Sequence, residues 1–125
     1  MLAYVTLGTN DLARAGRFYD QLVELVGGKR VWEMDRSIGW STSENAPAFS
    51  VIKPYDGKPA TVGNGVMVAL GARSKAEVDA LHRKAIELGG KDEGAAGPRG
   101  DHFYAGYFRD LDGNKVAVFF MDRSS

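Results

Sequence analysis

The sequence contains no cysteine, and this absence excludes disulfides, thiolate metal sites and cysteine nucleophiles together. The 16 basic and 16 acidic residues cancel, and no block of like charge occurs, so the chain lacks the electrostatic footprint of a nucleic-acid or membrane-surface protein. No apolar run approaches the length of a membrane span, and residues 1–9 show no targeting pattern. We therefore expect a cytoplasmic protein whose partners are small molecules or proteins, with no nucleic-acid or membrane partner.

What the sequence does contain is a long internal repeat. The strand pattern of residues 4–9 recurs at residues 67–72, and the glycine pair at residues 27–28 recurs at residues 89–90. The offset is 63 from residue 4 to residue 67 and 62 from residue 27 to residue 89. A repeat of this length indicates two copies of one supersecondary unit, and 125 residues suffice for both copies to share one domain.

The first copy has the pattern of a strand, a helix and three short strands. Val5 and Leu7 alternate with more polar residues, as in a strand with two different faces. Asn10 or Asp11 is a suitable cap for a helix that ends near Val26. The other strands of this copy are expected over residues 29–35, 38–42 and 49–52.

The second copy repeats this order. A strand is expected over residues 66–70, and Ser74 and Glu77 have the spacing of a capping box that begins a helix over residues 75–88. The strand near residues 91–93 is expected to be short or irregular, and residues 94–101, rich in glycine, to form an exposed, mobile loop. The final hairpin is expected over residues 103–109 and 115–121.

Two motifs resemble the vicinal oxygen chelate superfamily, which contains glyoxalase I, extradiol dioxygenases, fosfomycin-resistance enzymes and bleomycin-resistance proteins. The first is Val5-x-Leu7 followed by Asn-Asp-Leu-x-x-Ala-x-x-Phe-Tyr over residues 10–19, and the second is Phe-Arg-Asp-Leu-Asp-Gly-Asn-Lys-Val over residues 108–116. The resemblance implies an α+β fold of two tandem βαβββ modules, with curled mixed sheets that enclose a cleft and helices on the outer faces. It also implies a homodimer. Residues 1–125 are expected to form one such domain, with module one at 1–53, a linker at 54–64 and module two at 65–123.

The resemblance also specifies where metal-dependent members hold their ion. The corresponding positions here are Tyr4, Met67 and Ala117. Neither a thioether nor an alanine methyl is a competent ligand for the metals of this class, and a tyrosine could bind only as a phenolate. We therefore expect no metal and no other cofactor.

Strand parity predicts which residues share the concave surface. The candidate ligand-binding residues are Tyr4, Thr6, Met67, Ala69 and Ala117, together with His102 and Tyr104 near the mouth of the cleft. An aromatic pocket lining is a further possibility for Trp32, Trp40, Phe49 and Phe119. The alternative is that these side chains simply fill the interior. His82 is expected to be a helix-flank or interface residue rather than a metal ligand.

The leading hypothesis is a metal-independent small-molecule-binding protein of the glyoxalase/bleomycin-resistance type. The alternative is a glyoxalase-like lyase or isomerase with a non-standard or metal-free active site, in which His102 and either Tyr4 or Tyr104 act as acid and base. A third hypothesis is a dimerising interaction module. The sequence leaves open the ligand, whether a reaction is catalysed, and whether modules pair within one chain or between two.

Overall fold

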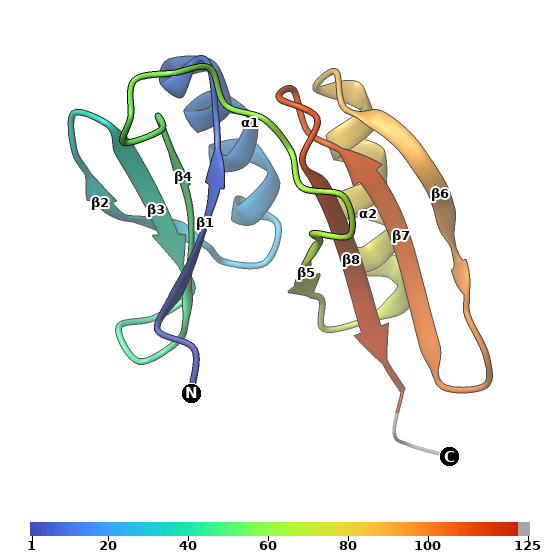
Figure 1. Ribbon diagram of the computed structural model, residues 1–125. Coiled ribbons are helices and arrows are strands. Elements are labelled where there is room, and N and C mark those ends of the chain that lie inside the picture. Colours follow the sequence, from blue (N-terminus) through green and yellow to red (C-terminus); the bar gives the residue numbers. More distant parts are fainter. Residues whose placement is uncertain (123–125) are drawn as a thin grey trace. The chain divides into compact units, whose positions relative to one another are not determined.

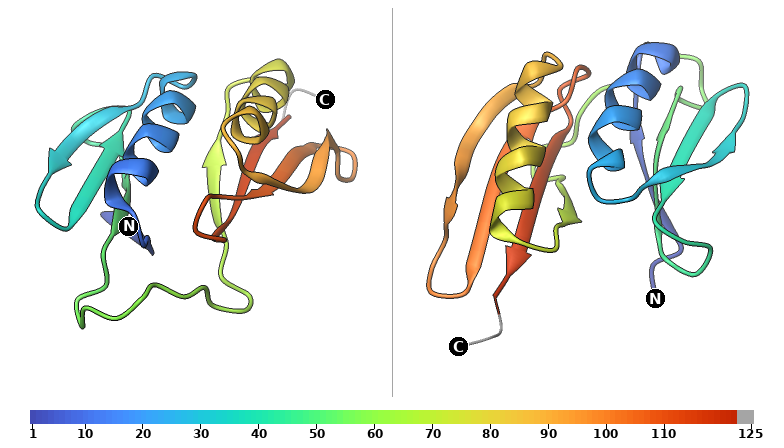
Figure 2. Two further views of the ribbon diagram at one scale, coloured as in Figure 1. Left: turned by 90° about the horizontal axis from the view of Figure 1, so that it is seen from above. Right: turned by 180° about the vertical axis from the view of Figure 1, so that it is seen from behind.

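The computed structural model describes residues 1–122, which fold as two compact units, each with one sheet and one helix (Figure 1). Unit 1 spans Met1–Val62, and unit 2 begins at Gly63. In each unit the helix lies against one face of its own sheet (Figure 2). The predicted end of module two at residue 123 lies outside the described residues.

Unit 1 contains the predicted βαβββ order. Its elements are β1 (Tyr4–Gly8), α1 (Leu12–Glu24), β2 (Lys29–Glu33), β3 (Ser37–Ser41) and β4 (Ala48–Ile52). The four strands form sheet A in the order β1-β4-β3-β2. Strands β1 and β4 are parallel, and the other neighbours are antiparallel.

Unit 2 repeats this topology. Its elements are β5 (Val68–Gly71), α2 (Lys75–Glu87), β6 (Lys91–Pro98), β7 (Phe103–Arg109) and β8 (Lys115–Met121). They form sheet B in the order β5-β8-β7-β6, with the single parallel pair again between the first and last strands. The predicted α+β fold of two βαβββ modules with mixed sheets is confirmed, and neither sheet closes into a barrel.

The same glycine turn ends both helices. Gly27 and Gly89 have φ values of 81° and 103°, a backbone region that glycine enters without steric penalty. The next residue then donates its N–H back into the helix, from Gly28 to the Val23 carbonyl at 2.8 Å and from Gly90 to the Ala85 carbonyl at 2.9 Å. The glycine pairs of the repeat are therefore helix stops at equivalent places.

The helix starts are also capped by side chains. Asp11 accepts from the N–H of Arg14 at 3.0 Å, so Asp11 rather than Asn10 caps α1. Asn10 instead binds the Ala60 backbone, accepting from its N–H at 2.7 Å, and so ties the segment after β4 to the residues that precede α1. Ser74 caps α2 by accepting from the N–H of Glu77 at 3.1 Å, as predicted.

The core of unit 1 is an aromatic cluster between α1 and sheet A. Tyr19 of α1 packs on Trp40 and Phe49, with ring centroids 5.6 and 4.6 Å apart, and all three side chains are buried. Of the two alternatives for Trp40 and Phe49, the structure shows the filling of the interior and not the lining of a ligand pocket. Side chains alternate along a strand, so Trp40 and Phe49 face the helix while their neighbours Gly39 and Ser50 lie on the opposite face.

The segment 94–101 also differs from its predicted loop. Strand β6 continues through Pro98 and pairs with β7, so only residues 99–102 remain as a turn. The pairing is irregular, with register shifts between Asp92 and Gly94 and between Gly94 and Gly97. Glycine is common at such bulges, and here its presence made a paired strand resemble a loop.

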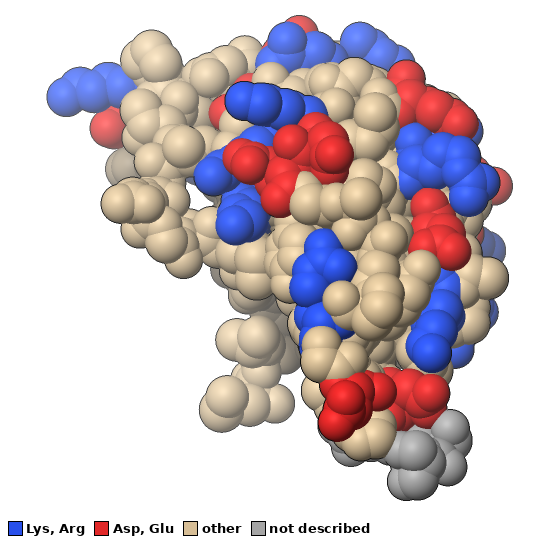
Figure 3. Space-filling view, turned by 90° about the vertical axis from the view of Figure 1, so that its right-hand side faces the viewer, with Lys and Arg blue, Asp and Glu red and all other residues tan. Residues whose placement is uncertain are grey.

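The helices and the surface add two observations. No helix in residues 1–122 has the length and apolar character that crossing a membrane requires. On the face shown in Figure 3, basic and acidic side chains are interspersed with uncharged ones.

Acid titration should expose the contribution of Asp20, which joins α1 to sheet A. Its carboxylate accepts from Arg30 Nη2 at 2.7 Å and from Trp40 Nε1 at 2.8 Å, and the Arg30 bond is the main cause that lowers the pKa of Asp20 below its ordinary value. The unfolded chain therefore binds more protons at acid pH, so this contribution is complete above pH of about 4 and is lost as the pH falls through the folded pKa.

Asp20→Asn should thus flatten the rise of unfolding free energy with pH below about 4, measured by urea unfolding followed through tryptophan fluorescence. The asparagine keeps an acceptor for Trp40, so the comparison isolates the charge. Equal slopes for the two proteins would contradict the expectation.

Candidate functional site

The helix-free face of sheet A carries a mixed aromatic and hydroxyl surface. Val5 and Leu7 of β1 point towards α1, so Tyr4 and Thr6 lie on the opposite face. The Tyr4 side chain is 60% exposed, and Thr6 is also exposed. The Thr6 hydroxyl lies 2.9 Å from the hydroxyl of Ser50, its cross-strand partner on β4.

Trp32 of β2 completes this surface. Its indole ring covers Gly39 of β3, where an added Cβ would collide with the ring, so the stacking requires glycine. The Trp32 Nε1–H donates to Ser37 Oγ at 3.0 Å, and Tyr4 packs on the ring in a T-shaped arrangement at 5.5 Å. We call the side chains of Tyr4, Thr6, Trp32, Ser37 and Ser50 on this side of sheet A the hydroxyl face.

The equivalent face of sheet B has different chemistry. Ala69 pairs with Ala117, and Ala117 pairs with Tyr107, in the same register that joins Thr6 to Ser50 in unit 1. Ala117 is buried, whereas Ala69 is exposed. This face therefore presents methyl groups where the hydroxyl face presents hydroxyls.

Cations border the apolar part of that sheet. The Arg99 guanidinium and the Lys115 ammonium lie 5.5 and 5.6 Å from the centre of the Tyr107 ring, within the range of cation–π attraction. Arg99 is further held by β6, since it donates to the Ala95 carbonyl at 2.8 Å. Met67, directly before β5, is exposed.

The two remaining predicted residues do not lie beside Ala117. Tyr104 donates its hydroxyl to Asp79 Oδ1 of α2 at 2.6 Å, so it lies on the helix-covered side of sheet B rather than on the face of Ala117. The bond to Asp79 raises the pKa of the Tyr104 phenol. His102 is exposed in the turn before β7, where its carbonyl accepts from the N–H of Asp122.

His82 of α2 forms hydrogen bonds within unit 2. His82 Nε2 lies 3.1 Å from Asp92 Oδ1 and 3.2 Å from the Tyr107 carbonyl oxygen. Both partners are acceptors, so this nitrogen carries the proton and ties α2 to β6 and β7. The pKa of Asp92 is lowered, mainly because its carboxylate also accepts from the Gly94 N–H. His82 is thus a packing residue of unit 2.

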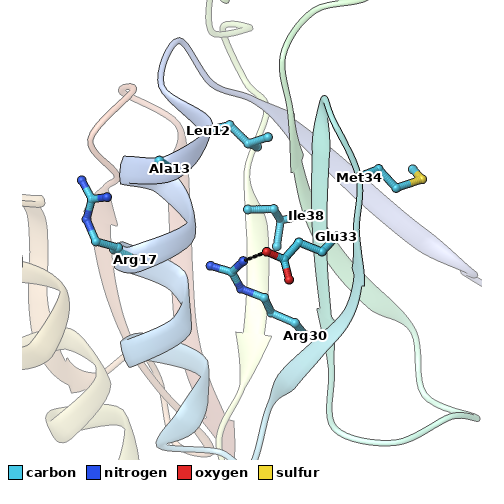
Figure 4. Close-up of a pocket in the computed structure, with 7 residues that line it drawn as sticks. All are labelled: Leu12, Ala13, Arg17, Arg30, Glu33, Met34 and Ile38. Atoms are coloured by element: carbon cyan, nitrogen blue, oxygen red, sulfur yellow. Dashed lines mark ion pairs between the residues drawn. The ribbon is translucent and has the colours of Figure 1, made fainter.

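A groove of about 450 Å³ lies on the other side of sheet A, between α1 and the β2–β3 hairpin (Figure 4). Its lining residues are Leu12, Ala13, Arg17, Arg30, Glu33, Met34 and Ile38. Arg30 pairs there with Glu33 at 2.9 Å and with Asp20 at 2.7 Å, so its charge is already matched within the protein. None of the predicted ligand-binding residues lines this groove.

The chemistry of the donor set does not fit the metal that the resemblance implies. Tyr4 packs on Trp32, Met67 offers only a thioether, and Ala117 offers no donor atom at all. Among residues 1–122, no three histidine, aspartate or glutamate side chains gather as a possible metal site.

Sequence reasoning missed Ser50, Gly39 and Ser37. The repeat could have revealed Ser50, because Thr6 and Ser50 correspond to Ala69 and Ala117 in the second copy. Gly39 had no signal of its own, because its role comes from the Trp32 ring placed over it.

Comparison with known proteins agrees with this architecture. A model of the Glyoxalase/Bleomycin resistance protein/Dioxygenase superfamily matches residues 1–118. No curated protein sequence matches the chain. A solved glyoxalase/bleomycin resistance protein from Albidiferax ferrireducens T118 is 32% identical, with a TM-score of 0.88 over 96% of this chain and 98% of that chain.

Two more distant solved structures share the fold. One is a glyoxalase/bleomycin resistance protein/dioxygenase family enzyme from Burkholderia phytofirmans PsJN, at 18% identity and a TM-score of 0.76 over 95% of this chain and 97% of that chain. The other is a lactoylglutathione lyase from Agrobacterium tumefaciens, at 22% identity and a TM-score of 0.69 over 96% of this chain and 92% of that chain. With the family match over residues 1–118, these findings show that the chain belongs to the glyoxalase/bleomycin resistance protein/dioxygenase superfamily.

Proposed function

We propose that this protein binds an organic small molecule without a metal, and that the hydroxyl face of unit 1 contributes to the binding surface. The observation that carries the proposal is the exposed Tyr4–Thr6 stretch beside a fixed Trp32 ring. The bond from Trp32 Nε1 to Ser37 and the glycine beneath the ring hold the indole in place before any ligand arrives. Such preorganisation reduces the entropy lost on binding.

The surface combines two kinds of contact that small-molecule sites use. Aromatic rings supply apolar contact area, and a few placed hydroxyls orient the ligand. Tyr4 stands at a position where metal-dependent relatives are expected to hold a histidine, and here its ring packs on Trp32 instead. The proposal therefore assigns Tyr4 to ligand contact. The predicted homodimer, the cytoplasmic location and a cleft shared by both modules stay predictions.

The enzymatic alternative receives less support from the geometry. Tyr104 could act as the general base only with a lowered pKa, but its bond to Asp79 raises the pKa of the phenol. Tyr104 also faces α2 rather than the side of sheet B that carries Ala117. Binding is therefore the function that the site supports best.

Fluorescence of Trp32 should report binding of simple aromatic probes. In a Trp40→Phe background Trp32 is the only tryptophan, and benzyl alcohol, benzylamine and benzoate can be titrated in turn. We expect a saturable change with at least one probe, unaltered by EDTA. Tyr4→Ala should weaken that binding by about three- to tenfold, the value of one aromatic contact.

Tyr55→Ala is the matched control, because Tyr55 is 91% exposed and stands in the segment after β4. It should leave the affinity unchanged. Elemental analysis of the same sample should find less than stoichiometric metal. Zinc, nickel, manganese or iron at one ion per chain that resists mild chelation would refute metal independence, and equal losses in the two tyrosine variants would refute the assigned face.

A further inference from the structure

The hydroxyl face contains a short chain of hydrogen bonds with a fixed direction. Ser50 Oγ donates to the carbonyl oxygen of Val5 at 2.8 Å. The same Ser50 oxygen lies 2.9 Å from Thr6 Oγ1. Ser50 is 0% exposed, so its hydroxyl is shielded from competing water.

The direction follows from counting protons. A hydroxyl has one proton to donate and two lone pairs that accept, whereas a carbonyl oxygen only accepts. The Ser50 proton is committed to Val5, so the proton between the two hydroxyls must come from Thr6. Thr6 Oγ1 consequently has no proton left for a ligand and presents lone pairs alone.

We propose that Thr6 is a specificity-determining residue that selects ligands carrying an O–H or N–H donor beside an apolar ring. The inference rests on the proposed function and names its ligand class. A donor group satisfies the Thr6 lone pairs, while Tyr4, two residues along the same strand face and about 7 Å away, offers its ring to the apolar part. A ligand group that only accepts, such as an ether or a carboxylate, forms no hydrogen bond with Thr6, because its oxygen lone pairs face those of Thr6 Oγ1.

The second unit shows that this polarity is not a property of the fold. The pair equivalent to Thr6 and Ser50 is Ala69 and Ala117, which contains no hydroxyl and no such chain. The two sheets share one strand order, while the faces turned away from the helices carry different side chains. Donor selection therefore belongs to the side chains of unit 1.

A matched pair of neutral probes tests the inference. Benzyl alcohol carries a donor, and benzyl methyl ether is the same molecule with that proton replaced by a methyl group. With Trp32 fluorescence in the Trp40→Phe background, benzyl alcohol should bind about fivefold more tightly than the ether, the value of one hydrogen bond. Benzoate should bind no better than the ether.

Three variants assign the preference to the hydroxyl chain. Thr6→Val removes the acceptor and should abolish the preference for the alcohol, whereas Thr6→Ser should retain it. Ser50→Ala removes the acceptor of the Thr6 proton, so Thr6 becomes free to donate and the affinity for benzoate should rise about fivefold. The ratio of affinities is the readout, because a purely structural defect weakens all probes alike.

The outcomes separate this inference from the proposed function. Equal affinities for alcohol and ether in the parent protein, with saturable binding of both, would overturn donor selection and leave binding intact. A preference that survives in Thr6→Val would also overturn it. Failure of every probe to alter Trp32 fluorescence would overturn the proposed function and this inference together.

Discussion

Trp40→Ala should lower the free energy of unfolding by about 3–5 kcal/mol, the usual cost of truncating a large buried aromatic side chain. Trp40 is only 2% exposed and stands between Tyr19 and Phe49, so alanine would leave a cavity at the centre of the unit 1 core. The change also removes the indole N–H that binds Asp20 at 2.8 Å. Urea unfolding followed by far-UV circular dichroism measures the effect.

Trp40→Phe is the matched control. It keeps most of the ring volume and loses the bond to Asp20, so we expect a cost of about 1–2 kcal/mol. A Trp40→Ala protein within about 1 kcal/mol of the wild type would show that the aromatic cluster does not sustain unit 1.

Asp110→Ala should destabilise unit 2 by about 2–4 kcal/mol, because it removes the carboxylate that accepts several hydrogen bonds at once. Asp110 is 6% exposed in the turn between β7 and β8. Its Oδ1 accepts from the N–H groups of Asp112 and Asn114, both at 2.9 Å, and its Oδ2 accepts from Asn114 Nδ2 at 3.0 Å. Alanine satisfies none of these donors.

Hydrogen exchange is the appropriate measurement, because both tryptophans lie in unit 1 and do not report on unit 2. We expect faster exchange of the β7 and β8 amides in Asp110→Ala and no change in β1 and β4. Asp101→Ala, at an exposed aspartate of the preceding turn, is the control and should exchange like the wild type. Equal protection in both variants would contradict the assigned role of the turn.

The order of elements could be predicted because its signals are local. The glycine turns that stop both helices, and the caps at Asp11 and Ser74, depend on residues within a few positions of one another. The end of β6 could not be predicted in this way. Its residues resemble a loop on their own, and they become a strand because β7 supplies the pairing partner.

The candidate site could be predicted only as far as strand parity reaches. Parity placed Tyr4 and Thr6 opposite the helix, because side chains alternate along β1. The face of Tyr104 could not be predicted, because it depends on the register of β7, and a shift of one residue reverses the face. Trp32 over Gly39 depends on a register shift between Arg30 and Trp32, which no sequence pattern reveals.

The parallel pairing of β1 with β4 also affects when the hydrogen bond between Thr6 and Ser50 forms during folding. Thr6 and Ser50 are 44 residues apart, so joining their strands closes a long segment of chain, whereas β3 and β4 meet as near neighbours. Contacts of high sequence separation form late, because the entropy of closure is lost before the contact is gained. We expect Thr6 to become an acceptor alone only late in folding, when its proton is committed to Ser50, and the Thr6 hydroxyl in a peptide of β1 alone to both donate and accept.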